Sequence, residues 1–282
     1  MNETLAFLGA GNMARSLISG LIQNGWNPSA LWATDINPQT LHALNEGFTH
    51  IHTTDDNALA LAHAEVVVLA VKPQSLAELA RAIAPQVAQR KPLLISIAAG
   101  VTLGDLEHWL GGEAALVRCM PNTPALIGCG ATALFANARV SPEQRALAES
   151  ILRAVGLTVW LEEEGQLDAV TALSGSGPAY FFLIMEALED AGVSLGLERD
   201  TARLLALQTA FGAAKLALES DEDAATLRAR VTSRGGTTEQ ALAVLEQGRL
   251  RDVFQQALEA AHHRSRELAQ QLGQDGATAS LR

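Results

Sequence analysis

A glycine-containing turn near the N-terminus constrains the fold of this chain more than any other feature. Residues 4–8 form a short apolar run, and residues 9–14 then match the pattern G-x-G-x-x-A before a helical pattern begins. At such a position Gly9 permits a tight turn, Gly11 lets a pyrophosphate approach the backbone, and Ala14 allows close packing of helix on strand. The sequence therefore predicts a strand–turn–helix unit that binds a dinucleotide.

Strand and helix patterns alternate through the first half of the chain. Apolar strands are expected at residues 4–8, 30–35, 66–71, 93–97, 117–120, 131–136 and 158–161, with a helix at 142–155 between the last two. This alternation indicates an α/β fold with a parallel, doubly wound sheet of Rossmann type.

The second half reads as helices. Residues 166–192, 199–219 and about 250–272 carry apolar helical patterns, and Pro178 is expected to break or kink the first. We expect a dinucleotide-binding domain over residues 1–161, an all-α substrate-binding and dimerisation domain over 162–273, and a disordered tail over 274–282. Because so small a bundle cannot bury these apolar helices by itself, we infer a homodimer.

The composition of the chain excludes some classes of binding partner. The net charge of −11 argues against nucleic acid or an anionic membrane surface. No uninterrupted apolar run approaches membrane-spanning length, since residues 66–71 stop at Lys72. Cys119 and Cys129 are expected to be buried free thiols, and the histidines show no metal-site spacing. We expect a cytoplasmic protein with a small-molecule substrate and no metal.

Three further positions suit a nicotinamide dinucleotide. Asp35 ends the second strand, where a carboxylate meets the adenosine ribose and repels a 2′-phosphate. Thr34 and Asn37 can still hydrogen-bond a phosphate, which leaves both NADPH and NADH open. Lys72 follows the strand at 66–71, and the small residues Ala98 and Ala99 leave room for a nicotinamide ring.

Residues 231–240 form a small-residue turn before a helix that we expect to end at Gly248. Thr237 and Gln240 fit a capping box. The backbone at Gly235 and Gly236 is open to a ligand, and free N–H groups at a helix start attract a carboxylate or phosphate. With Thr237 used as the cap, Thr238 would keep a free hydroxyl beside that seat.

The absence of a general acid favours an imine as the hydride acceptor. Reduction of a ketone needs a strong acid such as Lys or His near the alkoxide. In hydroxyacid dehydrogenases of this domain order a Lys on the interdomain helix serves, but residues 166–192 contain no Lys, Arg or His. A protonated imine already accepts hydride, and the product amine needs only a hydrogen-bond partner such as Thr238.

The chain resembles the pyrroline-5-carboxylate reductase family over nearly its whole length. The matching stretches are residues 7–14, 71–74, 120–125, 173–180 and 231–238. The resemblance implies reduction of 1-pyrroline-5-carboxylate to L-proline, the last step of proline biosynthesis, usually with NADPH. It also implies an interlocked helical dimer, often assembled into a decamer of five dimers.

The same resemblance implies a set of site residues. Thr238 is expected to be catalytic and to hydrogen-bond the ring nitrogen, while Gly236 and Thr237 receive the substrate carboxylate. The expected substrate contacts are Asn122, Glu164, Ser233, Gly235, Gly236, Thr237 and Thr238. The expected cofactor contacts are Gly9, Ala10, Gly11, Asn12, Met13, Thr34, Asp35, Asn57, Ala70, Val71, Lys72, Pro73, Ala98 and Ala99.

This chain departs from the family pattern in the substrate loop. Arg234 stands where the family usually has Pro, and Arg230 where relatives can carry an uncharged polar residue. We expect a modest effect on turn rigidity or substrate affinity.

Three other functions are open at this stage. They are a reductase of a related cyclic imine acid, a β-hydroxyacid dehydrogenase, and a non-catalytic NAD(P)-binding regulator. The missing helix Lys argues against the dehydrogenase, and a regulator would not need the seat at residues 235–238.

Overall fold

The computed structural model describes residues 3–278, and the side chains of residues 3–273. By internal contacts the chain divides into two units, one formed by residues up to Ser176 with those from Ala261 onward, the other by Gly177–Ala260. This division differs from the expected boundary at 161/162. Residues 162–176 stay with the sheet because they bond to it and to the last helix, as in the hydrogen bond from Ser265 Oγ to Asp168 Oδ1 at 2.7 Å.

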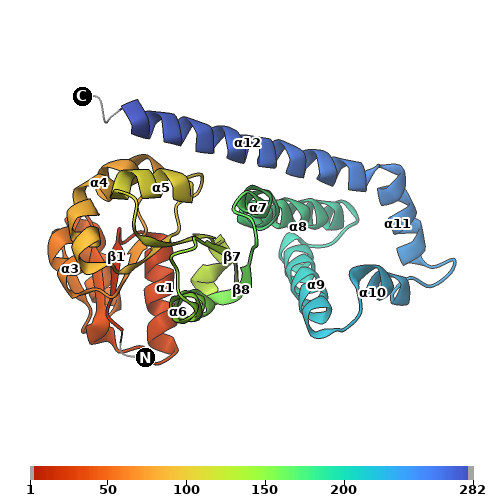
Figure 1. Ribbon diagram of the computed structural model, residues 1–282. Coiled ribbons are helices and arrows are strands. Elements are labelled where there is room, and N and C mark those ends of the chain that lie inside the picture. The colour runs from red at the N-terminus through yellow and green to blue at the C-terminus, as the bar shows by residue number, and fades with distance from the viewer. Residues whose placement is uncertain (1–2, 279–282) are drawn as a thin grey trace. The chain divides into compact units, whose positions relative to one another are not determined.

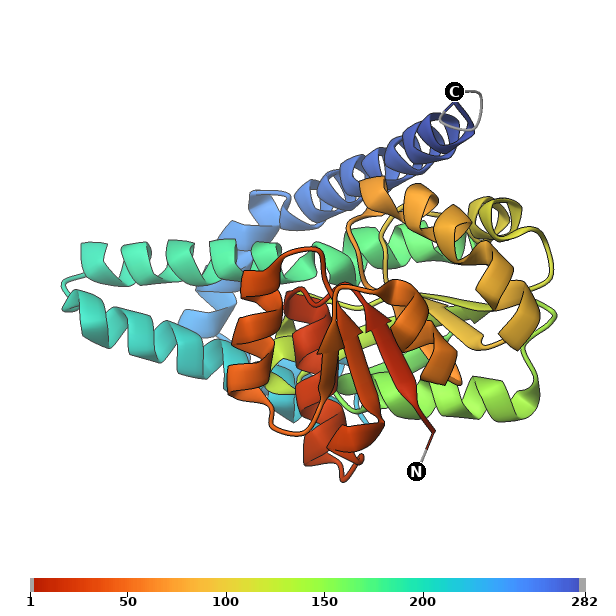
Figure 2. The same ribbon diagram turned by 90° about the vertical axis from the view of Figure 1, so that its left-hand side faces the viewer.

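The first unit is built on an eight-stranded sheet of order β3-β2-β1-β4-β5-β6-β7-β8 (Figures 1 and 2). The strands are β1 (Leu5–Leu8), β2 (Leu31–Thr34), β3 (His52–Thr54), β4 (Val66–Leu69), β5 (Leu93–Ser96), β6 (Ala115–Met120), β7 (Gly130–Ala136) and β8 (Gly156–Trp160). The Rossmann-type sheet is thus confirmed.

Two strands depart from the expected sheet. β7 runs antiparallel to β6, and β8 is parallel to β7. The reason is the short connection over residues 121–129, since a parallel neighbour requires a crossover of a dozen or more residues. β3, at the edge of the sheet, was not predicted because its sequence His-Thr-Thr lacks apolar residues.

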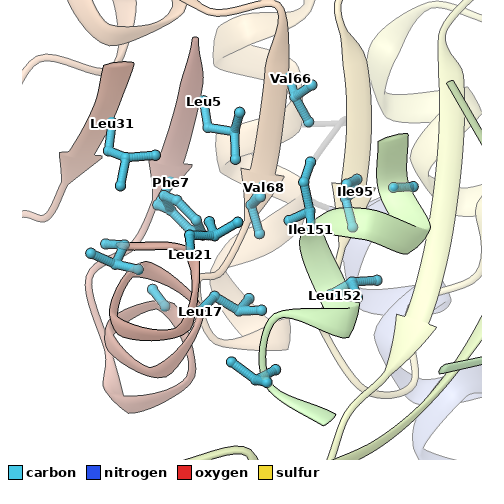
Figure 3. Close-up of a cluster of buried hydrophobic side chains, with 14 of the residues drawn as sticks. Leu5, Phe7, Leu17, Leu21, Leu31, Val66, Val68, Ile95, Ile151 and Leu152 are labelled. Atoms are coloured by element: carbon cyan, nitrogen blue, oxygen red, sulfur yellow. The ribbon is translucent and has the colours of Figure 1, made fainter. Parts of the chain in front are cut away.

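Helices cover both faces of the sheet, and two buried clusters join them to it. The helices and helical turns of this unit are α1 (Asn12–Gln23), η1 (Pro28–Ala30), α2 (Pro38–Gly47), α3 (Asn57–His63), α4 (Pro73–Arg90), α5 (Leu103–Leu110), η2 (Thr123–Ile127), α6 (Pro142–Arg153), α7 (Gln166–Val170) and η3 (Thr171–Gly175). Alternate residues of β1 point to opposite faces, as expected for a strand. Leu5 and Phe7 pack with α1 and α6 (Figure 3), whereas Ala6 and Leu8 pack with α3, α4 and α5.

The interruption expected in the 166–192 stretch is a π-helical turn, η3, followed by α8 (Gly177–Ser194). Pro178 is the second residue of α8 and directly follows this π-helical turn. π-Helical turns often occur at functional sites.

The second unit consists of α8, α9 (Arg199–Glu219), α10 (Ala224–Arg230), α11 (Thr237–Gln247) and the first part of α12 (Leu250–Thr278). α11 is followed by Gly248, as expected. α12 extends into the segment expected to be a disordered tail, whose last residues, 279–282, lie outside the described part of the chain.

Large apolar side chains on α8 and α9 are exposed in the single chain. Phe182 is 64% and Phe211 60% exposed. The stretch Gln166–Ser194 is long and apolar enough, by length and composition, to cross a membrane, and 17% of its most apolar window is buried. This corrects the expectation that no segment reaches such length, which counted only uninterrupted apolar runs. Exposed apolar patches of this kind mark a surface for another molecule.

Candidate functional site

The glycine turn has the geometry that a dinucleotide requires. Gly9 has φ +101°, and a Cβ there would lie 2.7 Å from the carbonyl carbon of Ala70, so only glycine fits. A Cβ on Gly11 would meet nothing within 4 Å. Gly11 is the N-cap of α1 and provides no side-chain cap. The first turn of α1, which includes Asn12 and Met13, thus offers unpaired N–H groups to a phosphate.

Asp35 is tied to the glycine turn. Its Oδ2 accepts the Ala10 N–H at 3.0 Å, and its Oδ1 accepts the Asn37 N–H at 2.9 Å. A carboxylate has about four lone-pair sites, so hydroxyl groups of a ribose can still donate to it. The same negative charge disfavours a 2′-phosphate.

Thr34 is buried, which alters the role expected for it. Its hydroxyl donates to Asn57 Oδ1 at 2.5 Å, and Asn57 is the first residue of α3. This hydrogen bond fixes the Asn57 amide so that its NH₂ group remains free to donate. The Thr34 hydroxyl is therefore engaged within the protein.

The remaining expected cofactor residues follow β4 and β5. Ala70, Val71, Lys72 and Pro73 come directly after β4, and Lys72 is exposed at the N-cap of α4. Ala98 and Ala99 come after β5, with Ala98 buried and Ala99 exposed. All these residues stand at the carboxyl ends of adjacent parallel strands, where open α/β sheets bind ligands.

Glu164 is held by two donors within the same unit. Its Oε1 accepts the Leu103 N–H at 2.8 Å and Arg118 Nη1 at 2.7 Å. Sequence reasoning missed Arg118, although a charged residue inside the apolar strand β6 was a usable signal.

Asn122 is also engaged. Its Oδ1 accepts the Ala131 N–H at 2.8 Å, and its Nδ2 donates to the Ser174 carbonyl in η3 at 3.1 Å. The side chain joins the start of β7 to the π-helical turn. This contact indicates a structural role beside the substrate contact that was expected.

The capping box expected at Thr237 is wrong. Gly236 is the N-cap of α11, and Thr237 is the first helical residue. No side chain caps the helix at this end. The Gly236 N–H instead donates to the Ser233 carbonyl at 3.0 Å. Gly235, with φ +73°, donates its N–H to Glu239 Oε2 at 2.7 Å.

Three donors at the start of α11 remain free among the described residues. Within the described residues, the N–H groups of Thr237 and Thr238 have no backbone acceptor, and the Thr238 hydroxyl makes no hydrogen bond. Of the two amides expected to receive a carboxylate, that of Thr237 is free and that of Gly236 is already bonded to the Ser233 carbonyl. Sequence reasoning gave no role to Glu239, whose position three residues after the N-cap was the available signal.

The two arginines that depart from the family pattern behave differently. Arg230 Nη2 pairs with Glu222 Oε1 at 2.5 Å. Arg234 makes no ion pair in the described chain.

The expected residues thus fall into two groups. The cofactor residues, Asn122 and Glu164 belong to the first unit, and residues 233–238 to the second. Among the described residues, no group of three His, Cys, Asp or Glu side chains is arranged to hold a metal ion.

Two family models match the chain. A model described as "NADP oxidoreductase coenzyme F420-dependent" matches residues 4–100, and one described as "Pyrroline-5-carboxylate reductase dimerisation" matches residues 164–268. The second match begins close to the expected start of the helical domain at residue 162.

Known relatives cover nearly all of the chain. It is 50% identical over 270 residues to pyrroline-5-carboxylate reductase of Pseudomonas aeruginosa, which covers 96% of this chain and 98% of that protein. A solved structure of a pyrroline-5-carboxylate reductase from Coxiella burnetii superposes with a TM-score of 0.92 at 48% identity, covering 95% and 99% of the two chains. The Plasmodium falciparum pyrroline carboxylate reductase, solved with NADP bound, gives a TM-score of 0.83 at 31% identity, covering 95% and 98%.

Proposed function

Because this chain belongs to the pyrroline-5-carboxylate reductase family, we propose that it reduces the C=N bond of 1-pyrroline-5-carboxylate to give L-proline. The reductant in this proposal is NADPH, with NADH as a second possibility. The observation that carries it is the pair of free amides at Thr237 and Thr238 beside the free Thr238 hydroxyl. A cyclic imino acid needs both a carboxylate seat and a partner for its ring nitrogen.

The first unit would hold the cofactor. Gly11 and the first turn of α1 fit the pyrophosphate, Asp35 and Asn57 fit the adenosine ribose, and Ala98 and Ala99 fit the nicotinamide. When bound, the cofactor supplies the hydride. Asp35 accommodates a free 2′-hydroxyl, and this is why NADH stays part of the proposal.

The second unit would hold the substrate. The amides of Thr237 and Thr238 receive the carboxylate, aided by the positive end of the α11 dipole. The protonated ring nitrogen donates its N–H to the Thr238 hydroxyl, which orients the imine. Hydride addition at carbon leaves an amine that the same hydroxyl can still bind, so no strong acid is needed.

We also propose that a second copy of the chain covers the exposed apolar side chains of α8 and α9. Their exposure supports this homodimer, as does the match to the dimerisation model. We further propose that these dimers assemble into a decamer. We also propose a cytoplasmic location, which is in keeping with two free cysteines.

An absorbance assay at 340 nm tests the reaction, with pyrroline-5-carboxylate and either NADPH or NADH. Rapid oxidation of either cofactor is expected. Cofactor binding without oxidation would refute the proposal and point to a related cyclic imine acid or to a non-catalytic regulator.

The variant Thr238→Ala tests the assigned hydroxyl. Loss of a hydrogen bond to a charged group costs about 1.5–3 kcal/mol, so kcat/KM should fall roughly 10- to 150-fold, with cofactor affinity unchanged. Thr237→Ala, which removes the neighbouring hydroxyl, is the matched control and should stay within about threefold of wild type. Wild-type turnover in Thr238→Ala would remove the role given to this residue.

A further inference from the structure

The C-terminal end of α12 belongs to the same unit as the nucleotide-binding sheet and lies beside α5 (Figure 1). Its residues Ser265, Ala269 and Leu272 have the i, i+4, i+7 spacing that places side chains on one face of a helix. Ser265 is 6% exposed, and its hydroxyl donates to Asp168 Oδ1 in α7 at 2.7 Å. Because hydrogen bonds to carboxylates are strong, this bond fixes the rotation of the helix about its axis.

The same face of α12 contacts the loop that follows β5. A Cβ placed on Gly100 would lie 3.2 Å from Leu272 Cδ1 and 3.7 Å from the backbone nitrogen of Ala269. Gly100 is buried and has φ +77°, so the close approach of helix to loop favours glycine here. Ala98 and Val101 are buried in the cluster against which Leu272 packs. The loop is therefore held between the core of its own unit and α12.

The end of this loop is also next to α12. Thr102 is the N-cap of α5, and Asp105 Oδ2 accepts its N–H at 3.2 Å and its hydroxyl at 2.6 Å. A Cβ on Gly273 would lie 3.0 Å from the other carboxylate oxygen of Asp105. The helix thus borders the loop from Gly100 to the first turn of α5.

The loop contains the two small residues to which the proposed function assigns the nicotinamide. Ala98 is buried, and Ala99, between it and Gly100, is exposed. A flat ring that lies against the backbone needs this backbone in one conformation. Affinity rises when a loop is already held in its bound conformation, because binding then no longer has to order it.

We propose that Ser265 and Leu272 are positioning residues that fix the loop after β5 in the conformation that receives the nicotinamide. This inference rests on the proposed function, which assigns the adenosine half of the cofactor to Asp35 and Asn57, after β2 and β3. Because α12 contacts the loop after β5, loss of either positioning residue should weaken the binding of the nicotinamide half alone.

Two ligands separate this role from a general structural one, with dissociation constants measured by isothermal titration calorimetry. NADPH carries the nicotinamide, whereas 2′-phospho-ADP-ribose has the same adenosine, phosphates and second ribose without it. Ser265→Ala and Leu272→Ala should weaken NADPH binding about fivefold or more, because the loop is less often in its competent conformation. Binding of the fragment should change less than about twofold.

Two further variants complete the experiment. Leu272→Met nearly conserves the volume of the side chain and should lose less NADPH affinity than Leu272→Ala. Ile151→Val is the matched control, because it removes buried volume from α6 on the opposite face of the sheet. This control should lower the Tm without changing the ratio of the two dissociation constants.

Equal weakening of both ligands in Ser265→Ala and Leu272→Ala would overturn the inference, and so would unchanged binding of NADPH. If Leu272→Ala does not fold, Ser265→Ala decides the question alone, since it removes a single oxygen atom. Oxidation of NADPH by the wild-type protein with pyrroline-5-carboxylate is measured separately. Failure there would remove the proposed reaction, whereas an active wild type with unselective variants would remove only the role of α12.

Discussion

Replacing Arg234 with Pro should make the substrate loop more rigid. The Gly236 N–H bonds the Ser233 carbonyl, and Gly235 has a positive φ. These features fit a type II turn over residues 233–236, in which Arg234 occupies the second position, where Pro is favoured. The Arg234 N–H has no acceptor within the described residues, so Pro removes no hydrogen bond.

The size of the effect follows from the unfolded chain. A proline that fits its native φ stabilises a protein by about 0.4–1 kcal/mol, because the unfolded chain loses conformational freedom. For a protein of this size, the gain raises the apparent Tm by about 1–4 °C. A turn that is already ordered before binding should also lower the KM for pyrroline-5-carboxylate, by at most about fivefold for 1 kcal/mol.

The assay compares thermal unfolding and steady-state kinetics of Arg234→Pro, Arg234→Ala and wild type. The Ala variant removes the same charge without fixing φ, so it isolates the effect of the ring. Arg234 makes no ion pair in the described chain, and loss of its charge should therefore change stability little. An Arg234→Pro protein less stable than Arg234→Ala would refute the type II assignment.

Two other predictions concern the first unit. Asp35→Ser removes the negative charge near the ribose and should shift the ratio of kcat/KM values toward NADPH, measured at 340 nm with both cofactors; an unchanged ratio would show that Asp35 does not read the ribose. Burial raises the pKa of the Cys119 thiol, whereas Cys129 is exposed, so the expectation of a buried thiol is wrong for Cys129. Iodoacetamide at pH 8 should therefore modify Cys129 alone in the native protein, and mass spectrometry that found rapid labelling of Cys119 would contradict the buried site.

Most of the sheet could be predicted from the sequence because its strands are buried on both faces. The run Val66–Leu69 is apolar without interruption, as is typical of a parallel strand under helices. The direction of β7 could not be predicted from residue periodicity, which is the same for parallel and antiparallel strands. The direction of β7 follows instead from the short connection over residues 121–129, and the length of this connection was not considered in the prediction.

The parts of the candidate site that are formed by backbone could be predicted from the sequence. The parts that depend on pairing between side chains were harder to predict. The conformation of Gly9 follows from its place in the glycine pattern. The partners of Glu164 lie 46 and 61 residues away in sequence, so no local pattern points to them. Thr237 failed as a cap because Gly236 and Glu239 satisfy the turn without it.

The first unit is discontinuous in sequence, and this affects the order of events during synthesis. Its last contributor is the end of α12, where Ser265 bonds Asp168 and the Leu272 side chain lies 3.2 Å from where a Cβ on Gly100 would be. Ribosomes add about 5–20 residues per second, so the roughly 90 residues between Ser176 and Ser265 take about 5–18 s. The nucleotide-binding unit therefore stays incomplete on the ribosome, with the loop after β5 uncovered, until residues 265–272 have emerged.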